Sequence, residues 1–264
     1  MQPVHTIRVL LLWLSAGLLS ALLTVLACFP ASWLAPLVET QFGGRISLGD
    51  AQGSLWQGSA FIGAAASASD AITPLLPGRF SWQLSPRLLL GQVVLSLRNP
   101  QALLQPLHLS GNWWQWQLEH GAIALPAARL AALGAPLNTL QPNGDMLLGW
   151  DNLQLSRQDN GIHINGLMTL DLLQMSSRLS AIDPLGNYRM TFAWHHQQAD
   201  VSLTTSSGSL LLDGHGQLIN GHLRFSGSAQ AAQGQEENLA NLLNLLGQRR
   251  QQNNGKTVIE LEIT

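Results

Sequence analysis

Five side chains with metal-ligating chemistry lie close together in the C-terminal part of the sequence: His195, His196, Asp213, His215 and His222. Imidazole nitrogens and carboxylate oxygens are common zinc ligands, and these residues fall on neighbouring predicted strands. However, the run at 213–216 alternates acidic and histidine side chains with glycines, which is typical of a turn or strand edge. His222 alternates onto a polar face. We therefore predict that these residues hold no metal ion.

Other patterns that would indicate catalysis are missing from the sequence. It contains no HExxH helix and no GxSxG turn. Gly214 and Gly216 lack the third glycine and the following helix of a dinucleotide-binding loop. The acidic residues are scattered and form no pair suited to glycoside hydrolysis. We predict a protein that is not an enzyme and has no catalytic residues and no cofactor.

The tryptophan cluster Trp113, Trp114 and Trp116 could stack on a ligand or bury itself in a core. In a strand, Trp114 and Trp116 share one face with Leu118, which favours core packing for them. Trp113 falls on the other face with Gln115. We therefore predict Trp113 and Gln115 as candidate contacts with a partner protein.

Composition excludes several classes of protein. The chain has 264 residues, 46% of them apolar and 11% charged, where soluble domains carry about 25% charged residues. Thirteen basic and fifteen acidic residues give a net charge of −2, so we expect neither disorder nor binding to nucleic acid. A single cysteine, Cys28, excludes a disulfide framework within the chain.

The N-terminal part has the pattern of a membrane anchor. Residues 9–29 carry no charge and, as a helix, would extend about 32 Å, enough to cross a hydrocarbon core of about 30 Å. Arg8 precedes this segment and the next cation is Arg45. The bias predicts that residues 1–8 lie in the cytoplasm, 9–29 span the membrane, and 30–264 are exported.

Two other interpretations of the N-terminus remain open. A signal peptide cleaved after Ala27 would have a shorter apolar region than this one. Residues 25–28 also resemble a lipoprotein box, in which Cys28 would be acylated, although Leu26 is an unusual residue there. We favour the uncleaved anchor, and in all three cases the part from Pro30 onward is exported.

Alternation with a period of two dominates the exported part and predicts strands with one apolar and one polar face. Asn-Gly pairs at 143–144, 160–161 and 220–221 indicate hairpins. Residues 188–229 form four successive predicted strands, joined near 197, 207 and 220. We predict a mainly β fold with an antiparallel, curved sheet, which could be a sandwich, a barrel or an open trough. Two diverged halves, at about 43–135 and 140–264, are a further possibility.

Short helices are predicted at three places. Residues 31–42 follow the anchor, and residues 126–133 begin with a proline and are followed by a glycine. Residues 236–246 form the strongest candidate, because two glutamates open the segment and arginines follow it, as the helix dipole favours. The stripe Leu239, Leu242, Leu243 and Leu246 predicts that this helix packs on the sheet.

The ordered set of motifs in the exported part resembles type II secretion system protein N, also called general secretory pathway protein N. The residues that carry the resemblance are Pro30, Ala31, Trp33 and Leu34; Gly53, Ser54, Leu55, Trp56, Gln57, Gly58, Ser59 and Ala60; Trp82, Leu84, Pro86 and Gly91; Leu140, Pro142 and Gly144; Asp183, Pro184, Leu185, Gly186, Asn187 and Tyr188; Gly208, Leu210, Leu212, Gly214 and Gly216; Phe225, Gly227 and Ala229; and Leu242, Leu243, Leu246 and Gly247. The types of these residues suit turns and sheet burial, so we predict structural roles for them.

The resemblance implies a single-pass protein of the inner membrane with a periplasmic domain. It would belong to the type II secretion machinery of Gram-negative bacteria and contact the inner-membrane subunits named C, L and M. More remotely, the chain resembles bacterial proteins of the AsmA type, which have a similar anchor and greasy β architecture. The alternative function is therefore lipid binding or lipid transfer, in which Tyr188, Met190, Phe192 and Trp194 would face a phospholipid in an open apolar groove.

Overall fold

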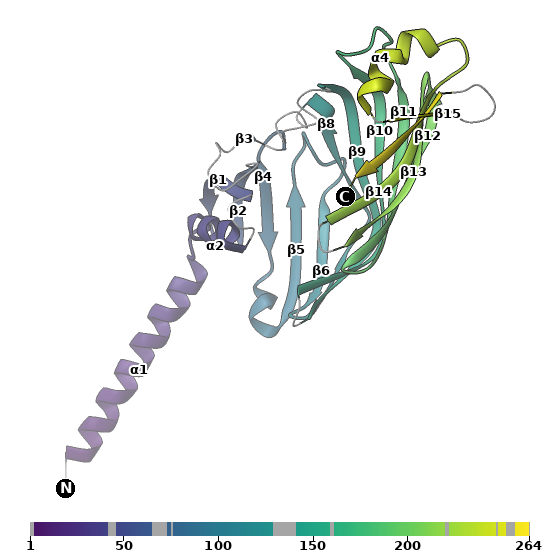
Figure 1. Cartoon of the computed structure of the whole chain (residues 1–264). Helices are drawn as coiled ribbons and strands as arrows, with labels where there is room; N and C mark the ends of the chain where they lie inside the picture. The colour runs from purple at the N-terminus through teal and green to yellow at the C-terminus, as the bar shows by residue number, and fades with distance from the viewer. Residues whose placement is uncertain are drawn as a thin grey trace.

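One large antiparallel sheet, with a long helix leaving it at one corner, makes up most of the protein (Figure 1). The computed structural model describes residues 3–41, 46–64, 73–74, 76–128, 141–158, 161–219, 222–246, 248–251 and 257–263. Within these ranges, sixteen strands join a single sheet. The mainly β fold with few helices is therefore confirmed.

The helices lie at the N-terminus, at one turn of the sheet and near the C-terminus. They are α1 (Pro3–Ala27), η1 (Ala31–Trp33), α2 (Leu34–Gln41), η2 (Pro86–Leu90) and α4 (Glu236–Leu246). The expected helices at 31–42 and 236–246 are confirmed, the first as far as Gln41. At 126–133, Pro126 ends a strand, Ala127 and Ala128 have 3-10 helical conformation, and residues 129–133 lie outside the described ranges, so this helix stays a prediction.

The structure gives no support of its own to the predicted membrane anchor. Among the residues it describes, no helix reaches both the length and the apolar character that a membrane crossing needs. The assignment of residues 9–29 as a transmembrane segment therefore stays a prediction.

The strands follow one another almost in chain order. Their bounds are β1 (Ile46–Gly53), β2 (Gln57–Ala64), β3 (Thr73–Pro74), β4 (Phe80–Leu84), β5 (Gln92–Arg98), β6 (Leu107–Asn112), β7 (Gln115–Leu118), β8 (Gly121–Pro126), β9 (Pro142–Gln158), β10 (Gly161–Ser177), β11 (Gly186–His196), β12 (Gln198–Gly208), β13 (Leu210–Ile219), β14 (His222–Ala231), β15 (Gln248–Gln251) and β16 (Thr257–Ile263). The order in the sheet is β1-β2-β4-β5-β6-β7-β9-β10-β11-β12-β13-β14-β16-β15, with β3 beside β2 and β8 beside β9. The predicted four-stranded meander is β11–β14.

The sheet has one apolar face that continues from strand to strand. Directly paired residues point to the same side of a sheet. One row of partners runs from Leu84 through Leu95, Leu109 and Leu118 to Leu153. A second row runs from Trp150 through Met168, Phe192, Val201 and Gly216 to Phe225. We call this side the apolar face and the opposite side the polar face.

Three bulges keep the apolar side chains on this face. Asp50, Asn152 and Gln174 have φ values of 49°, 43° and 50°, and each lies where the strand register shifts. The extra residue of a bulge changes which side of the sheet the following side chains point to, and it bends the strand. As a result Leu153 lies on the same side as Trp150, although the two are three positions apart.

The two outermost strands, β1 and β15, are not paired with each other in the described part of the chain, so the sheet is open and curved. Figure 1 shows the long strands β9–β14 bending together. Of the three predicted forms, the open trough therefore fits the structure. Both proposed halves of the chain belong to this one sheet, and the division into two halves stays a prediction.

Three groups of buried side chains line the apolar face. One joins Phe80, Leu107 and Trp150 across β4–β10, and a second joins Tyr188, Val201 and Phe225 across β10–β14. In the third, Leu239, Leu242 and Leu243 of α4 pack on Leu185, Leu210 and Ala229. This confirms that Leu239, Leu242 and Leu243 of the predicted stripe pack on the sheet, while the side chain of Leu246 lies outside the described part of the structure.

Glycines of β13 and β14 make room for the ring of Phe225. A Cβ atom added at Gly214 would lie 2.5 Å from Phe225 Cζ, and one added at Gly227 would lie 3.1 Å from Phe225 Cε1. At Gly216 a Cβ atom would meet the Arg224 carbonyl oxygen at 2.2 Å. The glycine motif found in the sequence therefore serves close packing between these strands.

We predict that Gly214→Ala lowers the free energy of unfolding by about 1–3 kcal/mol, because the added methyl group overpacks the Phe225 ring. The matched control is Gly49→Ala in β1, where the nearest atom, Phe61 Cβ, would be 3.8 Å away. We expect that change to stay within about 0.5 kcal/mol. Denaturant unfolding of the full chain in detergent measures both, and equal effects would contradict the packing argument.

Tyr188 is the only tyrosine of the chain and is buried in the second core group. Its hydroxyl donates a hydrogen bond to the Leu210 carbonyl oxygen at 3.0 Å. Burial raises the pKa of Tyr188 above its usual value of about 10, because the phenolate would lose its hydration. The folded state thus favours the neutral phenol.

A raised folded-state pKa means that stability is fully present below pH of about 10 and falls as the pH rises further. We predict that the phenolate absorbance of the folded protein titrates above pH 10 and that denaturant returns the midpoint to the usual value. Because there is one tyrosine, the signal has one source. A folded-state midpoint near 10 would show that the ring is open to water.

Candidate functional site at the joint of α1 and the sheet

The strand register defines two ends of the sheet. At one end lie the β1–β2 turn, η2, the β6–β7 turn and the ends of β9 and β10, because Gln57 pairs with Gln83, Gln92 with Asn112, and Gln115 with Ser156. We call this the α1 end, since α1 joins the sheet there (Figure 1). The opposite, far end carries α4 and the β10–β11 connection.

The turn at 54–56 holds the C-terminal end of α1 by hydrogen bonds. The indole Nε1 of Trp56 donates to the Leu26 carbonyl oxygen at 2.8 Å. The Leu55 amide donates to the Phe29 carbonyl oxygen, also at 2.8 Å, and Pro30 forms an antiparallel bridge with Ser54. These contacts satisfy carbonyl groups that a helix end leaves without partners.

A second tryptophan ties the same turn to β4. Trp82 Nε1 donates to the Leu55 carbonyl oxygen at 3.0 Å, and the Leu84 amide donates to the Trp56 carbonyl oxygen at 2.7 Å. Gly58 lies beneath the Trp82 ring, where an added Cβ atom would be 2.4 Å from Cζ2. Gly53 has φ +89°, a conformation suited to glycine. The motif at 53–58 is therefore the joint between α1 and the sheet.

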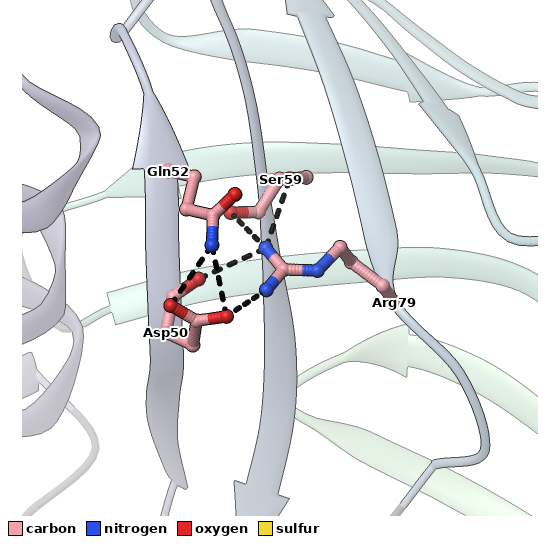
Figure 2. Close-up of polar contacts among 4 residues, drawn as sticks. All are labelled: Asp50, Gln52, Ser59 and Arg79. Atoms are coloured by element: carbon pink, nitrogen blue, oxygen red, sulfur yellow. Dashed lines mark hydrogen bonds and ion pairs between the residues drawn. The ribbon is translucent and has the colours of Figure 1, made fainter.

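A polar cluster on the other side of β1 and β2 supports the joint (Figure 2). Arg79 forms an ion pair with Asp50, and its Nη1 donates to the Asp50 carbonyl oxygen at 2.9 Å and to Ser59 Oγ at 3.0 Å. The Gln52 amide donates to both Asp50 carboxylate oxygens at 3.0 Å. The Arg79 guanidinium also lies 4.6 Å from the centre of the Phe61 ring.

This arrangement favours a mechanical role over a chemical one. The Asp50 carboxylate is engaged by a guanidinium and an amide, which hold β1, β2 and the segment before β4 together. No nucleophile with an adjacent base is among its residues. Within the described ranges, no group of three or more histidine, cysteine or acidic side chains could hold a metal ion.

The other motif residues are spread along the two ends. Pro86 begins η2 at the α1 end, where the Ser85 hydroxyl accepts a hydrogen bond from the Arg87 amide. Pro142 and Gly144 lie at the far end beside β10. Gly186 lies two residues after Pro184 and packs closely against Gly208. A Cβ atom added at Gly186 would lie 3.2 Å from the Cα atom of Gly208. The structure brings Gly53, Leu55, Trp56, Gly58 and Trp82 together in the joint, and Gly214, Gly216 and Gly227 around Phe225.

The five candidate metal ligands are all exposed. His215 lies opposite Ser226, and Asp213 lies opposite Ser228, on the polar face of β13. His196 at the end of β11 stacks edge-on against His163, with ring centres 5.2 Å apart.

Trp113 and Gln115 occupy different surroundings. Trp113 lies beside Gly91 at the tip of the β6–β7 hairpin, 3.2 Å from the position that a Cβ atom on Gly91 would take. Gln115 lines a polar hollow of about 490 Å³ with Gln117, Gln154 and Ser156. Their assignment as partner contacts stays a prediction.

The four candidate lipid-facing residues differ in exposure. Tyr188 is buried, whereas Met190, Phe192 and Trp194 are half-buried on the apolar face. Trp194 Nε1 donates to Met168 Sδ at 3.0 Å. Contact of these side chains with lipid stays a prediction.

Sequence reasoning missed the polar cluster of Asp50, Gln52, Ser59 and Arg79. The ion-paired residues are 29 positions apart, and nothing in their local pattern links them. The break in alternation at Asp50 was the one available signal, since a positive φ at that residue turns its carboxylate toward Arg79.

Comparison with known proteins identifies one family. The family model for type II secretion system (T2SS) protein N matches residues 44–260. Comparison with curated proteins finds no significant match, and neither does comparison with solved structures. The family match covers all the strands from β1 to β15, including the turn at 54–56, while the end of α1 in the joint lies before the matched residues.

We predict that Trp56→Phe, which keeps an aromatic ring but removes the donor to the Leu26 carbonyl oxygen, destabilises the joint by about 0.5–1.5 kcal/mol. Hydrogen exchange of the amides at 26–33 and 54–57 should accelerate, while exchange in β11–β14 stays unchanged. Trp114 was predicted to pack in the core but is instead 66% exposed in the β6–β7 turn, so Trp114→Phe is the matched control and should change neither. Unchanged exchange at 54–57 in Trp56→Phe would show that the indole bond does not hold α1.

Proposed function

The chain belongs to the type II secretion system protein N family, and on that basis we propose that it is a non-enzymatic subunit that supports assembly of the type II secretion machinery and export across the outer membrane. In this proposal residues 9–29 anchor it in the inner membrane, residues 1–8 are cytoplasmic, and the sheet lies in the periplasm. Family membership associates the chain with the envelope and with other components of that machinery.

The joint is the observation that carries the assembly role. A subunit that only tethered its domain to the membrane would need nothing more than a flexible linker between helix and sheet. Here backbone and indole hydrogen bonds connect the last residues of α1 and those just after it to the turn between β1 and β2. The same turn is hydrogen-bonded to β4. Such a connection supports an assembly role, because the domain then has a defined orientation relative to its anchor, as an assembly platform requires.

The sheet offers places where partner subunits could bind. β15 is the outermost strand on the C-terminal side, and the outer edge of a sheet can add a strand from another chain. On the other side, α2 packs against β1. We propose the β15 edge and the polar hollow around Gln115 as surfaces for the inner-membrane subunits C, L and M.

Lipid binding is the second candidate. Its support is the open form of the sheet and the half-buried side chains of Met190, Phe192 and Trp194 on the apolar face. An acyl chain could lie along these residues without any catalytic group. α4 covers the same face only toward the far end, through Leu239, Leu242 and Leu243.

Photo-cross-linking in native membranes separates the two functions. Probes replace Gln115 on the polar face and Met190 and Phe192 on the apolar face, and mass spectrometry identifies each adduct as protein or lipid. We expect adducts with secretion subunits at Gln115 and no phospholipid at 190 or 192. Phospholipid adducts at both apolar positions, without subunit adducts at Gln115, would replace the assembly role by lipid handling.

A further inference from the structure

Four large apolar side chains are exposed on two neighbouring tips of the sheet. Leu89 and Leu90 lie in η2, and Trp113 and Trp114 lie in the β6–β7 turn. Leu90 is 83% exposed, more than any other large apolar side chain outside α1 among the described residues. Burying such a group from water is worth roughly 1.5–3 kcal/mol for a leucine-sized side chain, so exposing four together suggests a binding role.

These side chains form one surface, which we call the apolar rim. Gln92, just after η2, pairs with Asn112, just before the tryptophans. Gly91 has φ +85° and lies against the Trp113 ring, as its added Cβ atom would be 3.2 Å from Cδ1. The two tips therefore lie side by side.

The apolar rim lies at the same end of the sheet as the joint. The Leu84 amide is bonded to the Trp56 carbonyl oxygen, and η2 begins two residues later. The β1–β2 turn that holds α1 and the tips of the rim thus share one edge. Figure 1 shows the turn between β4 and β5 at the lower edge of the sheet, the side from which α1 departs.

Two basic residues beside the rim favour an anionic bilayer surface as the partner. Arg87 flanks the leucines, and the Arg157 amide donates to the Trp114 carbonyl oxygen at 2.7 Å. The described residues of these tips, 85–92, 112–115, 156–158 and 161–162, include no acidic residue, and Asp159 between them lies outside the described ranges. At the α1 end, the carboxylate of Asp50 is ion-paired with Arg79, whereas Asp183, Glu236 and Glu237 lie near the far end.

We propose that the apolar rim inserts into the headgroup region of the bilayer that α1 enters, as a second, interfacial membrane contact. This inference rests on the proposed anchor. Tryptophan is enriched at membrane–water interfaces, and leucine with flanking arginine is typical of segments that lie in the interface of an anionic membrane. The bilayer would then be contacted at two separate places, α1 and the rim.

Two contacts fix an orientation that one contact leaves free. With α1 alone, the joint fixes the sheet relative to the helix, but helix and sheet together could still tilt and rotate in the bilayer. With the rim also in the interface, the α1 end of the sheet faces the membrane and the far end, with α4, points away. The polar hollow around Gln115 would then lie close to the membrane surface.

The test uses the full chain with one reporter at a time. Cys28→Ser removes the only native thiol, and Leu90→Cys or Trp114→Cys then carries an environment-sensitive fluorophore. Leu104→Cys is the matched control, because Leu104 is 68% exposed and follows β5 at the far end. Leu18→Cys in α1 reports on the anchor. Each variant is reconstituted into vesicles of phosphatidylcholine and phosphatidylglycerol with spin-labelled lipid quenchers.

We expect blue-shifted emission at positions 90 and 114, and quenching by shallow spin labels several-fold stronger than at position 104. The inference would be overturned if the probes at 90 and 114 showed water-like emission and were quenched no more than the probe at 104. This holds even if deep spin labels quench the probe at 18, which would show that α1 is inserted. Protection at 90 that arises only when other secretion subunits are added would overturn it too, in favour of a protein partner. An unquenched probe at 18 would instead count against the anchor of the proposed function, so the two failures are distinct.

Discussion

The structure depends on keeping the apolar side chains of strands β4 to β14 on one side of a single sheet. Alternation of apolar and polar residues does this within a regular strand. Where the alternation is interrupted, one extra residue is needed to return the next apolar side chains to the same side of the sheet. The bulges at Asp50, Asn152 and Gln174 supply that residue, each at a point where the register shifts. The apolar face then runs unbroken from β4 to β14, and the core groups and the packing of α4 follow from it.

The joint with α1 is built on the same principle. Trp56 and Trp82 bind the turn that holds the helix, while Arg79 connects Asp50 and Ser59 on the polar face. Strands at the edge of a sheet are usually its least constrained part. Here the edge strand β1 is restrained by indole contacts and by a charged cluster. That is why the first part of the sheet can transmit an orientation from α1 to the strands beyond.

The sequence predicted the features that repeat. Period-two alternation identified the meander from Tyr188 to Ala229, and the leucine stripe with its opening glutamates placed α4 at 236–246 with its packing face. The bulges could not be predicted, because a single inserted residue changes the facing without changing composition. Nor could the division of β9, whose first part pairs with β8 and whose second part pairs with β7. The contact of Arg79 with Asp50 depends on how β1, β2 and β4 lie side by side, and no spacing encodes it.

Strand order also determines how the sheet can fold. Apart from a few places, such as β9, which pairs with both β7 and β8, each strand pairs with the one made just before it. Closing such short loops costs little chain entropy, so the sheet can grow from its N-terminal side by adding one hairpin strand after another. Every intermediate ends in an unpaired strand with an exposed apolar face, which is prone to aggregate until the next strand arrives. The helix α4 follows β14 in the chain, so it covers the far end of the apolar face only after the strands of the meander have been made.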